Sequence, residues 1–105
     1  MRRGTTPTYT LGIDGYDLSG MTVFVTVKQG TVVLELTGGN LSIVTDKTGS
    51  TIVFALTQEQ TLGFAEGAAS VQVRFIDADG EAYATEIGRI YVSPVLKDGV
   101  IEYDG

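Results

Sequence analysis

Hydrophobic and polar residues alternate along much of this chain. Between Met21 and Val27 the odd positions are apolar, and threonines occupy two of the even positions. Strict alternation is typical of a β-strand with one buried face, because successive side chains point to opposite sides of a sheet. After a turn at Gln29-Gly30 the alternation resumes over Val32–Thr37, so the pattern predicts an antiparallel hairpin.

Further strands are predicted on both sides of this hairpin, separated by short clusters of turn-forming residues. They cover Thr8–Ile13, Leu41–Asp46, Thr51–Leu56, Ser70–Asp77 and Ala82–Val92. A spacing of about 8–12 residues between strands is typical of a sandwich or barrel. The inward parity changes within the last strand at Gly88, which predicts a β-bulge there. We therefore expect an all-β fold, an immunoglobulin-like antiparallel β-sandwich of about seven strands.

The stretch Thr57-Gln-Glu-Gln60 departs from the alternation and has the form of a capping box. It predicts one short helical turn around Gln58–Leu62, after which Leu62 and Phe64 would seal the open end of the core. The alternative is an irregular loop with a chance match to the pattern. The inward-facing residues of the predicted strands form the expected core, which comprises Met21, Val23, Val25, Leu34, Leu36, Ile52, Phe54, Leu56, Val71, Val73, Phe75, Ile90 and Val92.

The segment DADGEAYATE, residues 77–86, places oxygen-bearing side chains around a glycine, as a calcium loop does. In an EF-hand alignment, however, the first ligand position falls on Phe75, and the flanking residues alternate as strands instead of helices. Asp79-Gly80 between two alternating segments predicts a hairpin with a type I′ turn. We therefore expect a structural turn and no specific metal site, although the carboxylates could attract a cation weakly.

Composition narrows the classes of function. The chain has 105 residues, a formal net charge of −6 and only seven scattered basic residues, which opposes binding to nucleic acid or to an anionic membrane. No apolar run approaches the roughly 20 residues that span a bilayer. The two arginines near the start are followed by no apolar segment, so we expect no secretory signal.

The residues also offer little catalytic chemistry. Histidine and cysteine are absent, which removes the usual general base, the thiolate nucleophile and the commonest transition-metal ligands. Asp14 and Asp17 lie in a glycine-containing stretch that is typical of a solvated turn. No glycine-rich nucleotide fingerprint is present. We expect a protein that is not an enzyme, with no cofactor and no catalytic residues.

The ends of the chain are the candidate interfaces. We expect the sandwich to occupy residues 1–94 and an interaction arm, or a disordered tail, to occupy residues 95–105; the alternative is that the latter segment folds back as an edge strand. The first residues would form a basic N-terminal arm. The possible interface residues are Arg2, Arg3, Val95, Leu96, Val100, Ile101 and Tyr103.

Four stretches carry a resemblance to a known group: Met1–Thr8, Leu56–Leu62, Val71–Phe75 and Val95–Ile101. They are similar to small proteins encoded among the tail and baseplate genes of siphophages and prophages of Gram-positive hosts. The expected architecture also resembles the immunoglobulin-like N-terminal domain of phage upper-baseplate proteins, which is an attachment domain. The chain departs from those proteins in lacking their coiled-coil and receptor-attachment regions.

The resemblance implies a virion structural or assembly module of a phage tail or baseplate, synthesised in the bacterial host cytoplasm. Its partners would be other phage structural proteins or further copies of itself, without nucleic acid or membrane. The alternative is a β-sandwich that binds carbohydrate or another host-surface ligand through exposed tyrosines and acidic loops. An enzyme is the least favoured class.

Overall fold

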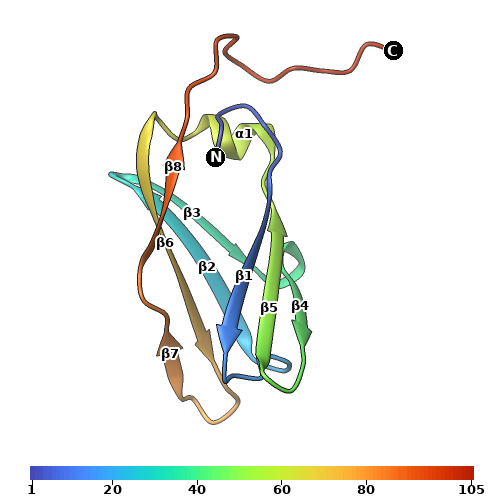
Figure 1. Ribbon diagram of the computed structural model, residues 1–105, viewed down its shortest axis with the longest axis vertical. Coiled ribbons are helices and arrows are strands. Elements are labelled where there is room, and N and C mark those ends of the chain that lie inside the picture. Colours follow the sequence, from blue (N-terminus) through green and yellow to red (C-terminus); the bar gives the residue numbers. More distant parts are fainter.

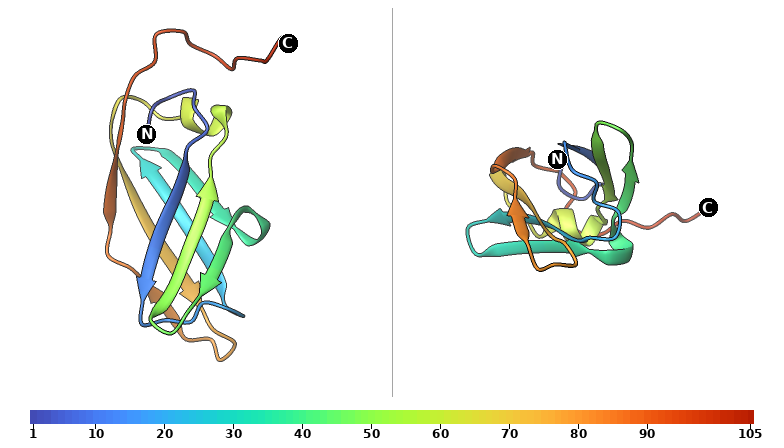
Figure 2. Two further views of the ribbon diagram at one scale, coloured as in Figure 1. Left: turned by 45° about the vertical axis from the view of Figure 1, so that its right-hand side comes forward. Right: turned by 90° about the horizontal axis from the view of Figure 1, so that it is seen from below.

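The computed structural model describes all 105 residues and places the strands in two antiparallel sheets that face each other (Figures 1 and 2). The first sheet has the order β1-β5-β4, formed by β1 (Thr8–Asp14), β5 (Gly49–Ala55) and β4 (Ser42–Thr45). The second has the order β3-β2-β6, formed by β3 (Val32–Thr37), β2 (Thr22–Gln29) and β6 (Gly67–Ile76). At its far edge, β7 (Ala82–Ala84) and β8 (Gly88–Val92) pair with successive parts of β6. The all-β sandwich predicted from the alternation is confirmed.

The helical turn predicted from the capping box is also confirmed. Helix α1 spans Gln58–Leu62 and crosses from β5 to β6 at one end of the sandwich (Figure 1). The Thr57 hydroxyl accepts a hydrogen bond from the Gln60 amide at 3.1 Å, and the Gln60 side chain accepts one from the Thr57 amide at 2.8 Å. A second short element, the 3₁₀ turn η1 (Gly38–Asn40), leads from β3 to β4.

The core consists of two clusters. The larger one fills most of the space between the sheets and includes Phe54 and Phe75, which are almost fully buried. The smaller one lies near α1 and consists of Val27, Phe64, Ala69 and Val92. Nine of the predicted inward residues are buried, and the remaining four are half-buried: Met21, Leu34, Val71 and Ile90. Ile13, Leu18, Val27 and Ala69 are buried residues that the predicted core did not include.

The last predicted strand is interrupted. Instead of one strand over Ala82–Val92 with a bulge at Gly88, the structure has β7 and β8 separated by three residues, Thr85, Glu86 and Ile87. Thr85 explains the interruption, because its hydroxyl accepts a hydrogen bond from the Val73 amide at 3.1 Å. The side chain thereby takes a position in the ladder that a backbone carbonyl would otherwise occupy, and the following chain swings outward.

The segment DADGEAYATE forms the predicted hairpin, but its turn is not type I′. Only Gly80 has a positive φ, at 84°, whereas a type I′ turn requires positive φ at both central residues. The loop is one residue longer, because the Asp77 amide donates to the Glu81 carbonyl. The Asp77 carboxylate accepts hydrogen bonds from the amides of Asp79 at 2.9 Å and Glu81 at 3.0 Å. This carboxylate therefore stabilises the turn.

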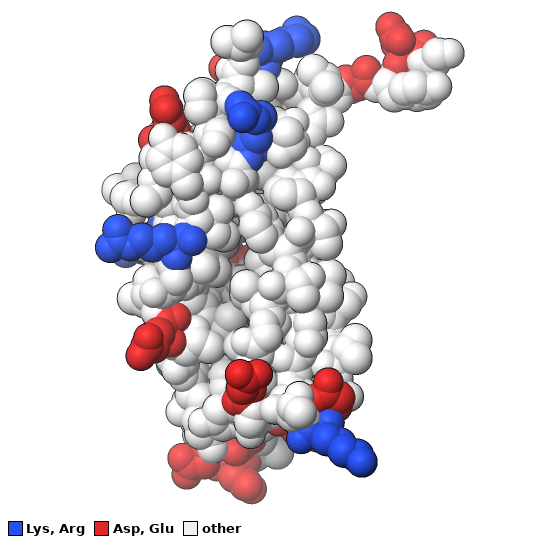
Figure 3. Space-filling view, in the orientation of Figure 1, with Lys and Arg blue, Asp and Glu red and all other residues white.

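Charge is distributed unevenly between the two ends of the sandwich. The loops opposite α1 carry the acidic residues Asp14, Asp17, Asp46, Asp77, Asp79 and Glu81, with Lys47 as their only basic neighbour in sequence. Figure 3 shows acidic side chains gathered at the lower end, together with one basic side chain, while basic side chains are more frequent in the upper half of the molecule. The Thr48 hydroxyl and then its amide lower the pKa of Asp46 by hydrogen bonding. Hydrogen bonds from the Ser19 hydroxyl and amide likewise lower the pKa of Asp17.

Candidate binding groove and terminal segments

A groove runs between β1, at the edge of the first sheet, and the edge of the second sheet where β6 pairs with β7 and β8. It consists of two adjoining pockets of about 260 and 270 Å³ that share Gly12, Ile13 and Thr85. Apolar side chains of Leu11, Ile13, Val71 and Val73 line the upper pocket. The groove lies where the sandwich is open at the side.

The interruption between β7 and β8 keeps this side open. Thr85 still donates its amide to the Val73 carbonyl at 2.9 Å, and the Gln72 side chain donates to the Thr85 carbonyl at 2.8 Å. Beyond Thr85 the chain leaves the sheet until Gly88, and Ile87 between them is 65% exposed. No strand therefore covers the upper pocket from the second sheet.

Strand β1 is an edge strand whose outer side has no partner. It pairs only with β5. The Leu56 amide donates to the Pro7 carbonyl and the Gly15 amide donates to the Thr48 carbonyl, which shows that the odd-numbered residues of β1 are the ones that bond to β5. In an antiparallel pair, alternate residues direct their backbone groups to the partner strand. The N–H and C=O groups of Thr8, Thr10, Gly12 and Asp14 therefore point away from β5. Four residues with unpaired backbone N–H and C=O groups therefore border the groove.

This edge lacks the usual protection against strand addition. Natural edge strands are commonly blocked by lysine, proline, a bulge or a short length. Strand β1 has seven residues, pairs with β5 without interruption, and contains no lysine or proline. Its one charged residue is Asp14, at the lower end. The edge is therefore chemically competent to accept a further strand.

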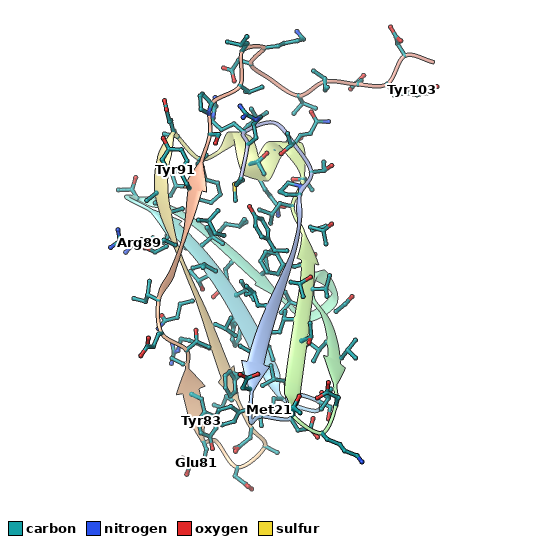
Figure 4. The ribbon with its side chains drawn as sticks, viewed as in Figure 1. Met21, Glu81, Tyr83, Arg89, Tyr91 and Tyr103 are labelled. Carbon is teal, nitrogen blue, oxygen red and sulfur yellow. The ribbon has the colours of Figure 1, made fainter.

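Aromatic residues line the lower pocket. The ring centroids of Tyr16, Phe75 and Tyr83 lie 5.2–5.3 Å apart, and Asp14 lies beside them in the same pocket. Figure 4 places Tyr83 at the lower end of the sandwich, near Glu81. Burial, and then the charges of Asp77 and Glu81, raise the pKa of the Tyr83 hydroxyl, so this hydroxyl remains a hydrogen-bond donor through the neutral range.

The two arginines predicted at an N-terminal arm lie against the domain. Arg2 forms a parallel bridge with Ser93, and its guanidinium donates to the Pro94 carbonyl at 2.7 Å. Arg3 donates to the carbonyls of Leu62, the last residue of α1, at 3.1 Å and of Phe64, two residues further on, at 2.7 Å. Its side chain is only 23% exposed. Arg3 therefore connects the N-terminal segment to the end of α1, while Arg2 remains on the surface.

The C-terminal segment, which we call the arm (residues 95–105), extends beyond the sheets from the end that carries α1 (Figures 1 and 2). Val95 is half-buried near Gly4, whereas Leu96, Val100, Ile101 and Tyr103 expose half or more of their surface. Figure 4 shows Tyr103 near the outer end of the arm, far from the sandwich. Beyond Gly99 the arm is held by two hydrogen bonds, between the Gln58 side chain and the Ile101 amide and carbonyl.

Sequence reasoning identified the arm residues but missed the groove and its edge. It also missed Ser50, a buried serine whose hydroxyl donates to the Tyr16 carbonyl and accepts from the Leu18 amide, both at 2.9 Å. These bonds hold the loop that carries Tyr16 against β5, and so help to shape the lower pocket. The sequence did contain a signal for Ser50. It lies two residues before Ile52 and four before Phe54, so alternation places it on the inward face of β5, and a buried hydroxyl needs hydrogen-bond partners.

Comparison with known proteins adds no family. Neither a scan against protein-family models nor a search of curated proteins finds a match to this chain. Within the structure, no three His, Cys, Asp or Glu side chains gather where they could hold a metal ion. None of its helices is long and apolar enough to cross a membrane.

Proposed function

We propose that this protein is a non-enzymatic structural or assembly module that acts through protein–protein contacts. Its resemblance to small tail and baseplate proteins supports a place in the tail or baseplate of a phage particle. The partners are other phage structural proteins or further copies of the chain. The observation that carries the proposal is the combination of an unprotected β1 edge, an adjoining apolar groove and an exposed apolar arm.

Strand order supports the immunoglobulin-like assignment within this proposal. In such sandwiches one sheet contains strands B, E and D, and the other contains G, F and C, with C′ added in the variable type. The order β1-β5-β4 facing β3-β2-β6 with β7 and β8 corresponds to B-E-D facing C′-C-F-G. Strand A, which would lie beside B, has no full counterpart. Only the short pairing of Arg2 with Ser93 lies near the upper end of that position.

Purified particles from the strain that encodes the chain test the proposed location. We expect mass spectrometry to find the protein in intact particles after density-gradient purification, and antibody labelling in electron microscopy to mark the tail or baseplate. Tailless capsids from the same preparation are the matched control and should lack the protein. Recovery of the protein only in the soluble lysate, with none in particles, would refute a virion role.

The lower pocket favours a second candidate, a module that binds carbohydrate or another host-surface ligand. Sugar rings stack on aromatic faces, and carboxylates accept hydrogen bonds from their hydroxyl groups; Tyr16, Tyr83 and Asp14 offer both. Glycan arrays with and without calcium would test this reading. Binding that is lost in Tyr83→Ala and retained in Tyr91→Ala would support it, because Tyr91 is an exposed tyrosine away from the pocket.

A further inference from the structure

We propose that the arm of one copy docks as an added strand on the β1 edge of a second copy, with Ile101 and Tyr103 inserted into the groove. This inference rests on the proposed function, since it specifies the contact through which the module would assemble. It assigns an acceptor surface, an occupant and a direction of docking, each of which follows from a separate observation.

The acceptor surface combines free backbone hydrogen-bonding groups with an adjoining pocket that has apolar side chains. Thr8, Thr10, Gly12 and Asp14 present free backbone N–H and C=O groups along the outer side of β1. Addition of a strand to such an edge obtains affinity from backbone hydrogen bonds and specificity from pockets for alternate side chains. The upper pocket lies directly beside these groups; Leu11, Ile13, Val71 and Val73 give it an apolar floor, and polar residues including Glu86 complete its lining.

The arm has the sequence that such a strand requires. Over residues 100–104 the side chains alternate, so an extended strand directs Ile101 and Tyr103 to one side and Val100, Glu102 and Asp104 to the other. Burial of the Ile101 and Tyr103 side is favourable, whereas burial of the opposite side would desolvate two carboxylates. Two solvent-exposed hydrogen bonds with Gln58 have to be released before Ile101, which is already 54% exposed, can dock.

Charge selects the direction of docking. If the arm runs antiparallel to β1, Lys97 lies beyond the acidic lower end near Asp14, and Asp104 lies toward the upper end near Arg2. The parallel direction would bring like charges together at both ends. Figure 3 shows a mainly uncharged surface over the centre of this face, with red side chains most frequent at the lower end, although a blue one lies at the lower right and red ones also lie at the upper left and on the arm. The antiparallel arrangement is therefore the electrostatically matched one.

Length and direction exclude the arm of the same copy. The arm leaves the upper end of the sandwich, where β1 begins, so it could descend along its own β1 only in the parallel direction. Docking antiparallel would require it first to travel down the length of β1, about 23 Å for seven residues. The arm has 11 residues, about 36 Å when extended, which is too short for the descent and the return. The occupant is therefore the arm of a second copy.

A contact of this kind is heterologous, because the arm and the edge are different surfaces of the chain. Heterologous contacts build rings when the rotation between copies closes, and open filaments when it does not. Each copy contributes one arm and one acceptor edge. The full chain should therefore self-associate as its concentration rises, either into a closed ring, of which a reciprocal two-copy exchange is the smallest, or into an open filament.

Sedimentation of the full chain over a range of concentrations tests the contact. We expect self-association that weakens at least about tenfold in Ile101→Asp, because the new carboxylate would enter the apolar groove. Val100→Asp is the matched control, as a neighbouring exposed aliphatic residue on the other side of the strand, and it should associate as the unaltered chain does. Equal loss in both variants, or a chain that stays monomeric at about millimolar concentration, would overturn the proposal.

The acceptor side is tested by Thr10→Pro, which removes an outward N–H while leaving the ladder to β5 its own hydrogen bonds. Alone, Thr10→Pro and Ile101→Asp should each be monomeric. Their mixture should form dimers and no larger species, because one variant retains the edge and the other retains the arm. Full self-association of Thr10→Pro, or no dimer in the mixture of two folded variants, would contradict docking at β1.

Hydrogen exchange on the unaltered chain gives a test that does not depend on the folding of a variant. The amides of Thr10 and Gly12 should gain at least about tenfold protection as concentration rises, whereas Tyr9 and Leu11, which are bonded to β5, should not change. No gain at Thr10 and Gly12 in an associated sample would overturn this contact. If hydrogen exchange shows no gain but the protein is found in tails, the docking proposal fails and the proposed function stands. If the protein is absent from particles, the proposed function fails, and the hydrogen-exchange result is unaffected.

Discussion

The two terminal segments lie at the same end of the sandwich, and their contacts with it differ in kind. Residues 1–7 donate or accept hydrogen bonds with Ser93, Phe64, Leu62, Leu56 and Thr61, and Met1 also packs against both core clusters. Beyond Gly99 the arm is hydrogen-bonded to the domain through the side chain of Gln58 alone. Sequence alone suggested an arm at both ends. Carbonyl groups left free at the end of α1 and after β8 give the N-terminal segment a place in the domain, and the arm has no equivalent partners.

The largest difference between the two terminal segments is expected when each is deleted and the free energy of unfolding is compared. Deletion of residues 1–3 removes the Arg3 bonds and takes Met1 away from the smaller core cluster, so we expect a loss of about 3 kcal/mol or more in the free energy of unfolding. Deletion of residues 101–105 is the control and should change that free energy by less than about 0.5 kcal/mol. Denaturant unfolding measures both. Similar losses for the two deletions would show that the arm belongs to the folded domain.

Arg3 should account for much of the N-terminal effect. Its guanidinium donates to two carbonyls at the C-terminal end of α1, and hydrogen bonds from a charged donor contribute about 1.5–3 kcal/mol. We expect Arg3→Ala to lower stability by that amount, and Arg3→Lys to recover only part of it because an ammonium cannot reproduce the fork. Arg2→Ala is the control, with a single exposed bond to Pro94, and thermal unfolding should detect little change.

Thr61 supports the same segment from inside the domain. It is fully buried, and its hydroxyl is close to the carbonyls of Thr5 at 3.0 Å and Gln58 at 3.1 Å. Thr61→Val keeps the shape of the side chain and leaves the Thr5 carbonyl without this partner, so we expect a loss of about 1–2 kcal/mol. Gln58→Ala removes the contact of α1 with the arm and should cost less than about 0.5 kcal/mol. A larger effect for Gln58→Ala than for Thr61→Val in urea unfolding would reverse the comparison.

The smallest effect is expected for the ion pair that joins the two terminal segments. The Arg3 guanidinium lies 3.5 Å from the Asp98 carboxylate, and the Asp98 side chain is 80% exposed. Exposed pairs of this kind contribute little, because water and salt screen them. Asp98→Asn should therefore shift the midpoint of unfolding negligibly at either low or high salt. A clear, salt-dependent loss would show that the first residues of the arm are fixed to the domain.

Local pattern accounts for most of the strands. The alternation over Met21–Val27 predicted β2, and the capping box at Thr57–Gln60 predicted α1, because each signal lies within one short segment. The turn at Asp79-Gly80 was predicted as a hairpin but with the wrong type. Asp77 decides that turn by accepting two backbone amides, a contact that propensities at the two central positions do not contain.

The candidate site was much less predictable. The exposed residues of the arm were identified because Val100, Ile101 and Tyr103 follow the last strand and Pro94. The groove was missed because it arises where Thr85 takes a ladder position on β6 and the chain then leaves the sheet. The Thr85 hydroxyl can replace a backbone carbonyl only because its segment lies beside β6. The alternation of hydrophobic and polar residues predicts strands, but it does not predict which strands become neighbours.

By itself the sequence determined the β class, most strand positions, the helical turn and the absence of histidine and cysteine chemistry. These properties depend on side-chain period, local capping and residue type, which act over a few positions. Tertiary structure decided that Arg3 is an internal contact, that Ser50 and Thr61 are buried, and that β1 remains a free edge beside an apolar groove. Every strand has two edges, and only the packing of all the others determines which edge is left without a partner.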